Sequence, residues 1–119
     1  MPDEPETPDL SAYVPLAPAA LHIVLSLNRG ERHGYAIMGD VDRLSDGVIK
    51  LGPGTLYGTI KRMVASDLIE ESGRRPAPED DDTRRRYYTL TQLGRQVVTL
   101  EAERLQLLVG VARDKQVLG

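Results

Sequence analysis

A glycine-rich turn that leads into a helix, "LGPGTLYGTIKRM" at residues 51–63, constrains the fold of this chain more than any other stretch. Such turns often hold phosphate, because exposed N–H groups and the helix dipole favour an anion at a helix N-terminus. A dinucleotide-binding fingerprint needs a βαβ unit around its glycines and the spacing G-x-G-x-x-G. Gly58 comes one residue too late for that spacing, and no Gly-Lys-Ser/Thr follows. A nucleotide cofactor is therefore disfavoured, and the phosphate of a DNA backbone is the better interpretation.

Three helical patterns occupy the first half of the chain. Pro18 suits a first helical turn, where its missing N–H costs nothing, and "AALHIVLSL" continues that helix. Residues 34–44 predict a second helix, since their apolar side chains recur at helical spacings. The third helix is expected to begin near Gly54 or Thr55. Its buried stripe is predicted to comprise Leu56, Ile60, Met63 and Val64.

Two short extended runs and a long helix follow. "DLIEES" at 67–72 and "TRRRYYTL" at 83–90 predict a hairpin around "GRRPAPEDDD", and Thr91 is the expected N-cap of a helix that reaches about residue 116. This order indicates a mainly α fold with a small β-hairpin, namely a winged helix-turn-helix domain plus a long C-terminal dimerisation helix. We expect a disordered acidic, Pro-rich arm at 1–14, the DNA-binding domain at 15–90 and the dimerisation helix at 91–119.

Composition excludes several classes of protein. A chain of 119 residues is one domain, and it contains no cysteine and only two histidines, so neither thiol catalysis nor a metal centre is expected. No paired acid and base suggest an enzyme, and no cofactor is expected. The chain has no apolar run of about 18 residues and no signal peptide, so we expect no membrane association and a cytoplasmic location.

The distribution of charge permits DNA binding although the formal net charge is −3. Seven acidic residues lie in two blocks, within residues 1–12 and at 80–82, and without them the remainder carries +4. Basic residues gather in the third helix, in the segment between the two strand-like runs, and at the start of the second run. A basic patch on an acidic protein can bind a polyanion, because affinity depends on the contacting surface.

Four stretches in order and spacing carry a resemblance to a known family: "HGYAIM", "LGPGTLYGTIKRM", "DLIEES" and "RRRYYTLTQLGRQV". Over residues 16–98 the chain resembles the PadR-like transcriptional regulators, and its single C-terminal helix resembles the short branch of that family. The resemblance implies a homodimeric winged-helix regulator, commonly a repressor, that binds an inverted-repeat operator and is often released by a small hydrophobic effector. Asp67 departs from the glycine usual at the start of the first wing strand, and the acidic insert at 79–82 is unusual.

The candidate DNA-binding residues lie in the second helix, the third helix and the wing. Tyr35 is expected to pack in the core, or to reach phosphate through its hydroxyl, while Tyr57 should pack on the second helix and reach DNA. Thr55 is expected to cap the third helix, contact phosphate, or both. Lys61 and Arg62 are expected to read guanine edges or to hold phosphate, and the wing arginines Arg84, Arg85 and Arg86 are expected to contact phosphate.

The last helix has an apolar band too broad for one small domain to cover, which favours a second copy of the chain as partner. Glu101 and Arg104 interrupt any regular heptad along this helix. The dimer contacts are expected at Leu93, Val97, Leu100, Leu107, Leu108 and Val111. The alternative to a DNA-binding regulator is a winged-helix module that contacts only other proteins.

Overall fold

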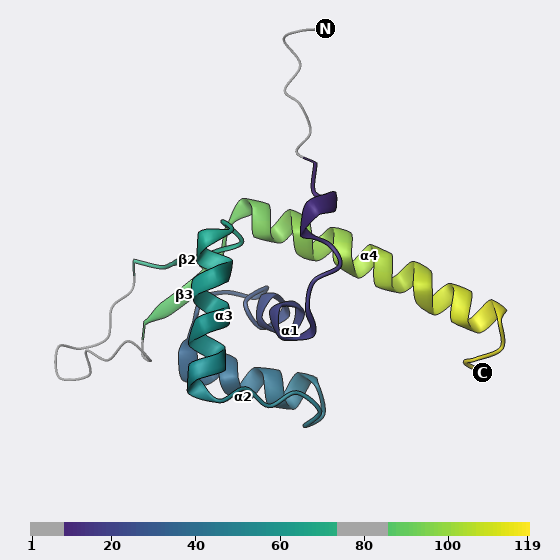
Figure 1. Ribbon diagram of the computed structural model, residues 1–119, viewed down its shortest axis with the longest axis horizontal. Coiled ribbons are helices and arrows are strands. Elements are labelled where there is room, and N and C mark those ends of the chain that lie inside the picture. Colours follow the sequence, from purple (N-terminus) through teal and green to yellow (C-terminus); the bar gives the residue numbers. More distant parts are fainter. Residues whose placement is uncertain (1–8, 74–85) are drawn as a thin grey trace, which may run out of the picture.

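The computed structural model describes residues 9–73 and 86–119, and it confirms a mainly helical chain with a small antiparallel sheet (Figure 1). Its helices are α1 (Pro18–Ser26), α2 (Gly34–Leu44), α3 (Pro53–Ala65) and α4 (Gln92–Asp114), preceded by a 3-10 turn, η1 (Ser11–Tyr13). The strands are β1 (Arg32–His33), β2 (Ile69–Glu71) and β3 (Tyr87–Leu90), in the order β1-β3-β2. This is the winged helix arrangement expected from the order of the sequence patterns.

A third strand joins the two that the sequence predicts. β1 pairs antiparallel with β3, Arg32 opposite Tyr88 and His33 opposite Tyr87, while β2 pairs with the other edge of β3. Tyr88 is buried, whereas Tyr87, which points to the other side of the strand, is half-buried. The hairpin is therefore fixed to the segment that immediately precedes α2.

The core lies where α1, α2 and α3 meet the sheet and the first half of α4. It comprises Ile23, Val24, Leu27, Ile37, Val41, Leu56, Ile60, Met63, Leu68, Ile69, Tyr88, Leu90, Val97 and Val98. On α3 the buried stripe is confirmed at Leu56, Ile60 and Met63, but Val64 is 39% exposed and was wrongly assigned to it. At about 100° per residue, Val64 lies roughly 40° beyond Ile60 around the helix, on the margin of the stripe, where the core no longer covers it.

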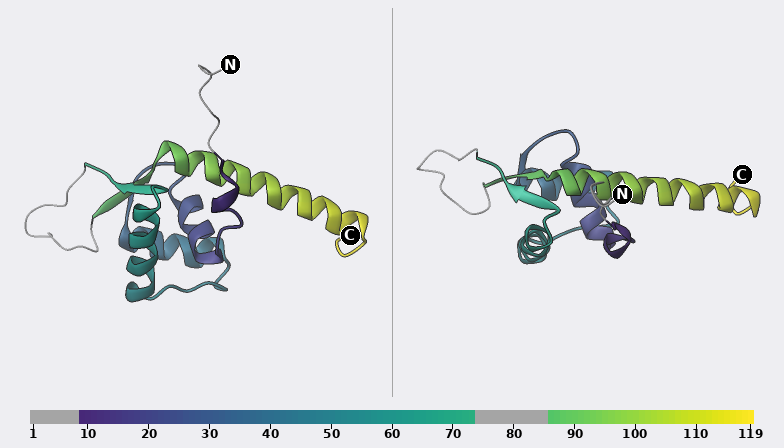
Figure 2. Two further views of the ribbon diagram at one scale, coloured as in Figure 1. Left: turned by 45° about the horizontal axis from the view of Figure 1, so that its top comes forward. Right: turned by 90° about the horizontal axis from the view of Figure 1, so that it is seen from above.

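The segment before α1 is more ordered than the sequence suggested. Residues 1–8 lie outside the described residues, but Leu10, Tyr13 and Val14 pack against the core, so the expectation of a disordered arm was wrong for residues 9–14. This segment also lies beside α4 in all views (Figures 1 and 2). Apolar side chains in a proline-rich stretch can be buried without a regular element, which periodicity does not detect.

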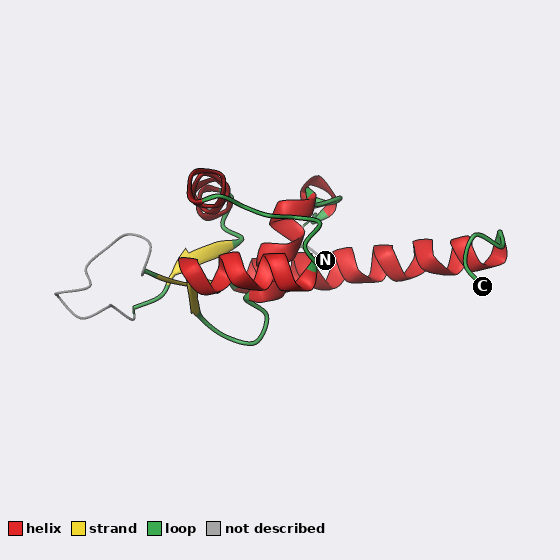
Figure 3. Ribbon diagram, turned by 90° about the horizontal axis from the view of Figure 1, so that it is seen from below, coloured by secondary structure: helices red, strands yellow, loops and turns green. Residues whose placement is uncertain are grey.

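Helix α4 starts on the sheet and then extends well past the other helices (Figures 2 and 3). Thr91 caps it as expected, because its Oγ1 accepts the N–H of Gly94 at 2.9 Å. Close packing explains Gly94 itself, since a Cβ there would lie 2.0 Å from the carbonyl oxygen of Leu68. The second half of the helix leaves Leu107, Leu108, Val109 and Val111 between 39% and 71% exposed.

Candidate nucleic-acid interface

Helix α3 turns a nearly bare side to the outside of the molecule. At about 100° per residue, Gly54, Gly58 and Lys61 lie opposite the buried stripe. A Cβ added at Gly54 would meet nothing within 4 Å, so packing within the described chain does not require glycine there. Glycine inside a helix costs about 0.5–1 kcal/mol relative to alanine. The outer side of α3 is therefore shaped for close approach by another surface, with Lys61 as its central cation.

Lys61 and Arg62 are adjacent in sequence but occupy different sides of α3. Lys61 is exposed on the outer side, whereas Arg62 turns back along the helix and donates from Nη2 to Oγ1 of Thr59 at 3.2 Å. Arg62 also lines a small cavity of about 210 Å³ with alanines at the start of α1. Both residues fall in the polar half of the helical pattern, so the pattern alone does not distinguish their directions.

Both candidate tyrosines lie at the N-terminus of α2. The Tyr57 ring packs against α2 as expected, so closely that a Cβ at Gly34 would lie 2.0 Å from its hydroxyl oxygen. Tyr35, next along α2, is 37% exposed, so the expectation of core packing was wrong. Its ring instead lies edge-on to His33, with ring centroids 6.4 Å apart.

Thr55 does not cap α3, contrary to expectation. The helix begins at Pro53 with Gly52 as N-cap, and Thr55 lies exposed in the first turn. Its carbonyl oxygen accepts the hydroxyl of Thr59 at 2.8 Å. Proline is preorganised for a first helical position, which moves the start of the helix two residues upstream of the expected cap. The exposed N–H groups of this turn keep the favourable electrostatics for an anion.

His33 is a structural residue that the sequence analysis missed. Its Nδ1 accepts the N–H of Ala36 at 3.2 Å and so caps α2, while its ring lies edge-on to Tyr87 at 5.5 Å between centroids. Histidine is not among the common capping residues, so no pattern signalled this role. Through β1, His33 links the start of the helix-turn-helix to the wing.

Of the three wing arginines only Arg86 lies within the described residues. Its side chain is exposed, and Nη1 lies 3.7 Å from Oε2 of Glu71 on the neighbouring strand. Arg84, Arg85 and the acidic block at 80–82 lie outside the described residues. Asp67, at the start of the first wing strand, has φ +63°, a left-handed conformation that Asp tolerates better than most residues. The turn is thus formed despite the departure from glycine.

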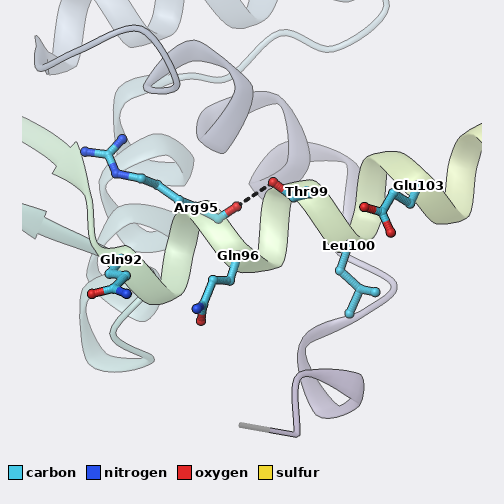
Figure 4. Close-up of a pocket in the computed structure, with 6 residues that line it drawn as sticks. All are labelled: Gln92, Arg95, Gln96, Thr99, Leu100 and Glu103. Atoms are coloured by element: carbon cyan, nitrogen blue, oxygen red, sulfur yellow. Dashed lines mark hydrogen bonds between the residues drawn. The ribbon is translucent and has the colours of Figure 1, made fainter. Parts of the chain in front are cut away.

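The expected dimer residues divide into two groups. Val97 is fully buried in the core of its own chain, so its assignment to the dimer contact was wrong, and Leu93 packs partly against the same core. Leu107, Leu108 and Val111 remain exposed, and Leu100 is half-buried. A depression of about 420 Å³ along the first half of α4 is lined by side chains of that helix alone, including Arg95, Thr99 and Leu100 (Figure 4). A depression lined by a single helix can pack against a neighbouring element but cannot enclose a small ligand.

Two buried carboxylates hold the domain together. Burial raises the pKa of Asp40, but the Ser26 hydrogen bond, the Arg43 contact and the positive charges of Arg32 and Arg43 outweigh it and hold the pKa below the ordinary value. For Glu101 the hydrogen bond from Arg104 is the main cause of a lowered pKa, opposed by burial and assisted by the Leu16 N–H. Both are paired anions, which makes them structural rather than catalytic.

Residues 9–73 and 86–119 contain no group of three or more His, Cys, Asp or Glu side chains placed to hold a metal ion. Within the same two ranges, no helix combines the length and the apolar character needed to cross a membrane.

The helix-turn-helix of α2 and α3, the adjoining three-stranded wing and the projecting α4 define a winged-helix protein of the transcription-regulator class. The sequence matches the family described as "Transcriptional regulator PadR-like family" over residues 23–100. The chain belongs to this PadR-like family, whose members are transcriptional regulators and not enzymes.

Individual proteins support the same assignment. A PadR family transcription regulator from Clostridium difficile R20291 superposes with a TM-score of 0.66 at 25% identity, over 87% of this chain and 100% of that one. A PadR-like regulator from Bacillus cereus, at 18% identity, shares the fold with a TM-score of 0.64, over 84% and 91% of the two chains. An uncharacterised 37.1 kDa protein in transposon TN4556 of Streptomyces fradiae is 33% identical over 92 residues, which is 77% of this chain and 24% of that protein. This chain thus spans about a quarter of that relative.

Proposed function

We propose that this regulator is a repressor that binds an inverted-repeat operator in cytoplasmic DNA as a homodimer joined through α4. The observation that carries the proposal is the outer side of α3, where Gly54 and Gly58 carry no side chain and Lys61 follows them on the same side. A helix with glycines on its outer side can lie deep in a major groove, and a lysine there can reach guanine O6 and N7. Membership of the PadR-like family supports the same use of α3.

The remaining candidates suit contacts to the DNA backbone. Thr55 and the exposed N–H groups of the first turn of α3 favour phosphate, and Tyr35 is exposed at the start of α2. Arg86 lies on the wing side, with Arg84 and Arg85 preceding it in the sequence. Backbone contacts of this kind set the orientation of the protein on DNA, whereas base contacts set specificity.

The homodimer is supported by the exposed apolar residues of α4. Leu107 is 71% exposed, Leu108 50% and Val111 46%, on a helix half that no other described element covers. Two winged domains related by a two-fold axis would place two α3 helices in grooves about one helical turn apart, which matches an inverted repeat. A small hydrophobic effector that releases DNA completes the proposal, as the family resemblance implies.

Binding titrations test this function directly. Operator fragments selected from a genomic library and a random duplex of equal length would be titrated at several salt concentrations. DNA binding requires the logarithm of affinity to fall linearly with the logarithm of salt, and the operator should be bound roughly 10³-fold or more tightly than random DNA. A protein-interaction module would show no such slope and no enriched sequence, and that result would reject the proposal. A reporter gene behind the selected operator distinguishes repression from activation.

A further inference from the structure

A cavity of about 380 Å³ lies between the end of α1, the segment that follows it and the second half of α2. Small-molecule sites usually occupy roughly 300–1,000 Å³. Its lining includes Leu25, Arg29, Arg32, Asp40, Arg43 and Leu44, and none of its lining residues belongs to α3 or β3. The cavity is therefore separate from the outer side of α3 that the proposed function uses.

A buried carboxylate fixes two guanidinium groups in the wall of this cavity. Asp40 is 6% exposed, and its Oδ2 accepts the Ser26 hydroxyl at 2.8 Å and lies 2.9 Å from Nε of Arg32. Its Oδ1 accepts Nη2 of Arg43, and Nε of Arg32 also donates to the carbonyl oxygen of Ser26. These contacts occupy one nitrogen of each arginine. A guanidinium has five N–H donors, so both arginines keep donors for a ligand.

A third arginine gives the cavity an excess of positive charge. Arg29 lines the same cavity and makes no hydrogen bond or ion pair with any other described residue. Three arginines and one carboxylate belong to the lining, which leaves an excess of two positive charges there. Two leucines of the lining remain partly open to solvent, Leu25 at 43% and Leu44 at 50% exposed. The lining thus combines cationic and apolar side chains.

We propose that this cavity binds a small organic oxyanion, a phosphate monoester or a carboxylate, whose apolar body lies on Leu25 and Leu44. Guanidinium groups pair with such oxyanions through two parallel hydrogen bonds, and prior fixation by Asp40 reduces the entropy lost on binding. The ligand would bridge α1 and α2 without contacting α3.

Calorimetric and NMR titrations with inorganic phosphate and phenyl phosphate, at fixed ionic strength, test the proposal on the full chain. Phenyl phosphate should bind with a dissociation constant below about 1 mM, and more tightly than inorganic phosphate. Arg29→Ala and Arg43→Ala should each weaken both probes about tenfold or more, because each removes a charge-assisted hydrogen bond. Leu44→Gln should remove the advantage of phenyl phosphate and leave inorganic phosphate unchanged. Arg113→Ala, an exposed arginine on α4, is the matched control and should bind both probes as the unaltered protein does.

Three results would overturn the proposal. One is the absence of saturable binding, which would make the arginines partners of Asp40 alone. Another is equal weakening by Arg113→Ala, which would indicate a general charge effect. The third is a loss of DNA affinity and of salt slope in Arg29→Ala, which would make DNA phosphate the oxyanion. Failure of the DNA titrations above would leave these probe measurements unaffected, so the two proposals are tested separately.

Discussion

The backbone N–H of Leu16 donates to Oε2 of Glu101 at 2.6 Å, across 85 residues of sequence. The other carboxylate oxygen accepts Nε of Arg104 at 2.5 Å, and the Glu101 side chain has no exposed surface. A residue that interrupts the apolar pattern of α4 is thus the point at which the segment before α1 is attached to that helix. Tyr13, in the same segment, donates to the carbonyl oxygen of Ser66 just after α3.

Glu101→Ala should destabilise the fold by about 1–3 kcal/mol, because it leaves the Leu16 N–H without its acceptor. Urea unfolding at one fixed protein concentration measures the change, with an unaltered m-value as the sign of an intact two-state transition. Glu103→Ala, exposed on the same helix, is the matched control and should remain within about 0.5 kcal/mol of the unaltered protein. Equal stability of the two variants would contradict a structural role for the buried carboxylate.

Stability should decrease as the pH falls below the ordinary carboxyl range. The pKa of Glu101 lies below its usual value of 4.5 in the folded chain, chiefly through Arg104, so the anion stabilises the fold. That contribution is complete above the unfolded pKa and disappears as pH falls through the folded pKa. Asp40 acts in the same direction. As the pH falls below 4.5, Glu101→Gln should therefore lose less stability than the unaltered protein does. The control Glu103→Gln should lose as much as the unaltered protein. Unfolding curves recorded across this pH range measure both variants.

Two glycines of α4 should respond to alanine in opposite ways. Gly94→Ala should cost about 1–3 kcal/mol or more, since its Cβ would overlap the backbone at Leu68. Gly110→Ala meets nothing within 4 Å and should gain about 0.5–1 kcal/mol from helix propensity. Thermal unfolding of both variants at equal concentration gives the comparison. A neutral Gly94→Ala would mean that α4 is not held against the backbone of Leu68 as described.

Lys61 and Arg62 should differ in the kind of affinity they supply. Lys61→Ala should cost about 1–3 kcal/mol on the operator and much less on random DNA, because Lys61 lies on the outer side of α3. Arg62→Ala should weaken both duplexes alike and reduce the salt slope by about one unit, as expected of a phosphate contact from the flank of the helix. Titrations of both duplexes at several salt concentrations separate the two effects. The opposite pattern would assign base reading to Arg62.

Replacement of Leu107 and Leu108 by Glu should give a monomer without unfolding the domain. Both side chains are at least half exposed in the single chain, so only a second copy would bury the new carboxylates, at a cost of several kcal/mol. Sedimentation at micromolar concentration measures the mass, and circular dichroism checks the fold. Gln106→Glu, on the polar side of the same turn, should remain dimeric. A monomeric unaltered protein would remove the basis of the proposed two-fold binding.

The elements that the sequence predicts well are those with strong local signals. Helix α2 has the bounds expected from its apolar period, and Thr91 caps α4 through the side-chain bond that threonine commonly makes. The glycine-rich turn and the two strand-like runs located α3, β2 and β3, although α3 begins at Pro53, upstream of the expected start. In each case the information lies within a few neighbouring residues.

The features that were missed depend on contacts between distant segments. β1 is only two residues long, and its pairing with β3 depends on the position of α2 and not on any alternation. From the sequence alone Glu101 is expected on the surface, and only the contact with the distant Leu16 N–H explains its burial. Similarly, the side of α4 that covers the core and the side that remains exposed are both apolar, so Val97 and Leu107 could not be distinguished before the domain was assembled.

The short strand β1 has a consequence for motion within the domain. Because His33 caps α2 and lies opposite Tyr87, the base of the wing and the start of the helix-turn-helix share one anchoring residue. The N-terminus of α2 in turn packs at Gly34 against the Tyr57 ring of α3, so that β3, α2 and α3 are linked by direct contacts. The wing base and the helix-turn-helix would bind a target as one rigid unit. Little conformational entropy would therefore be lost at the wing base on binding.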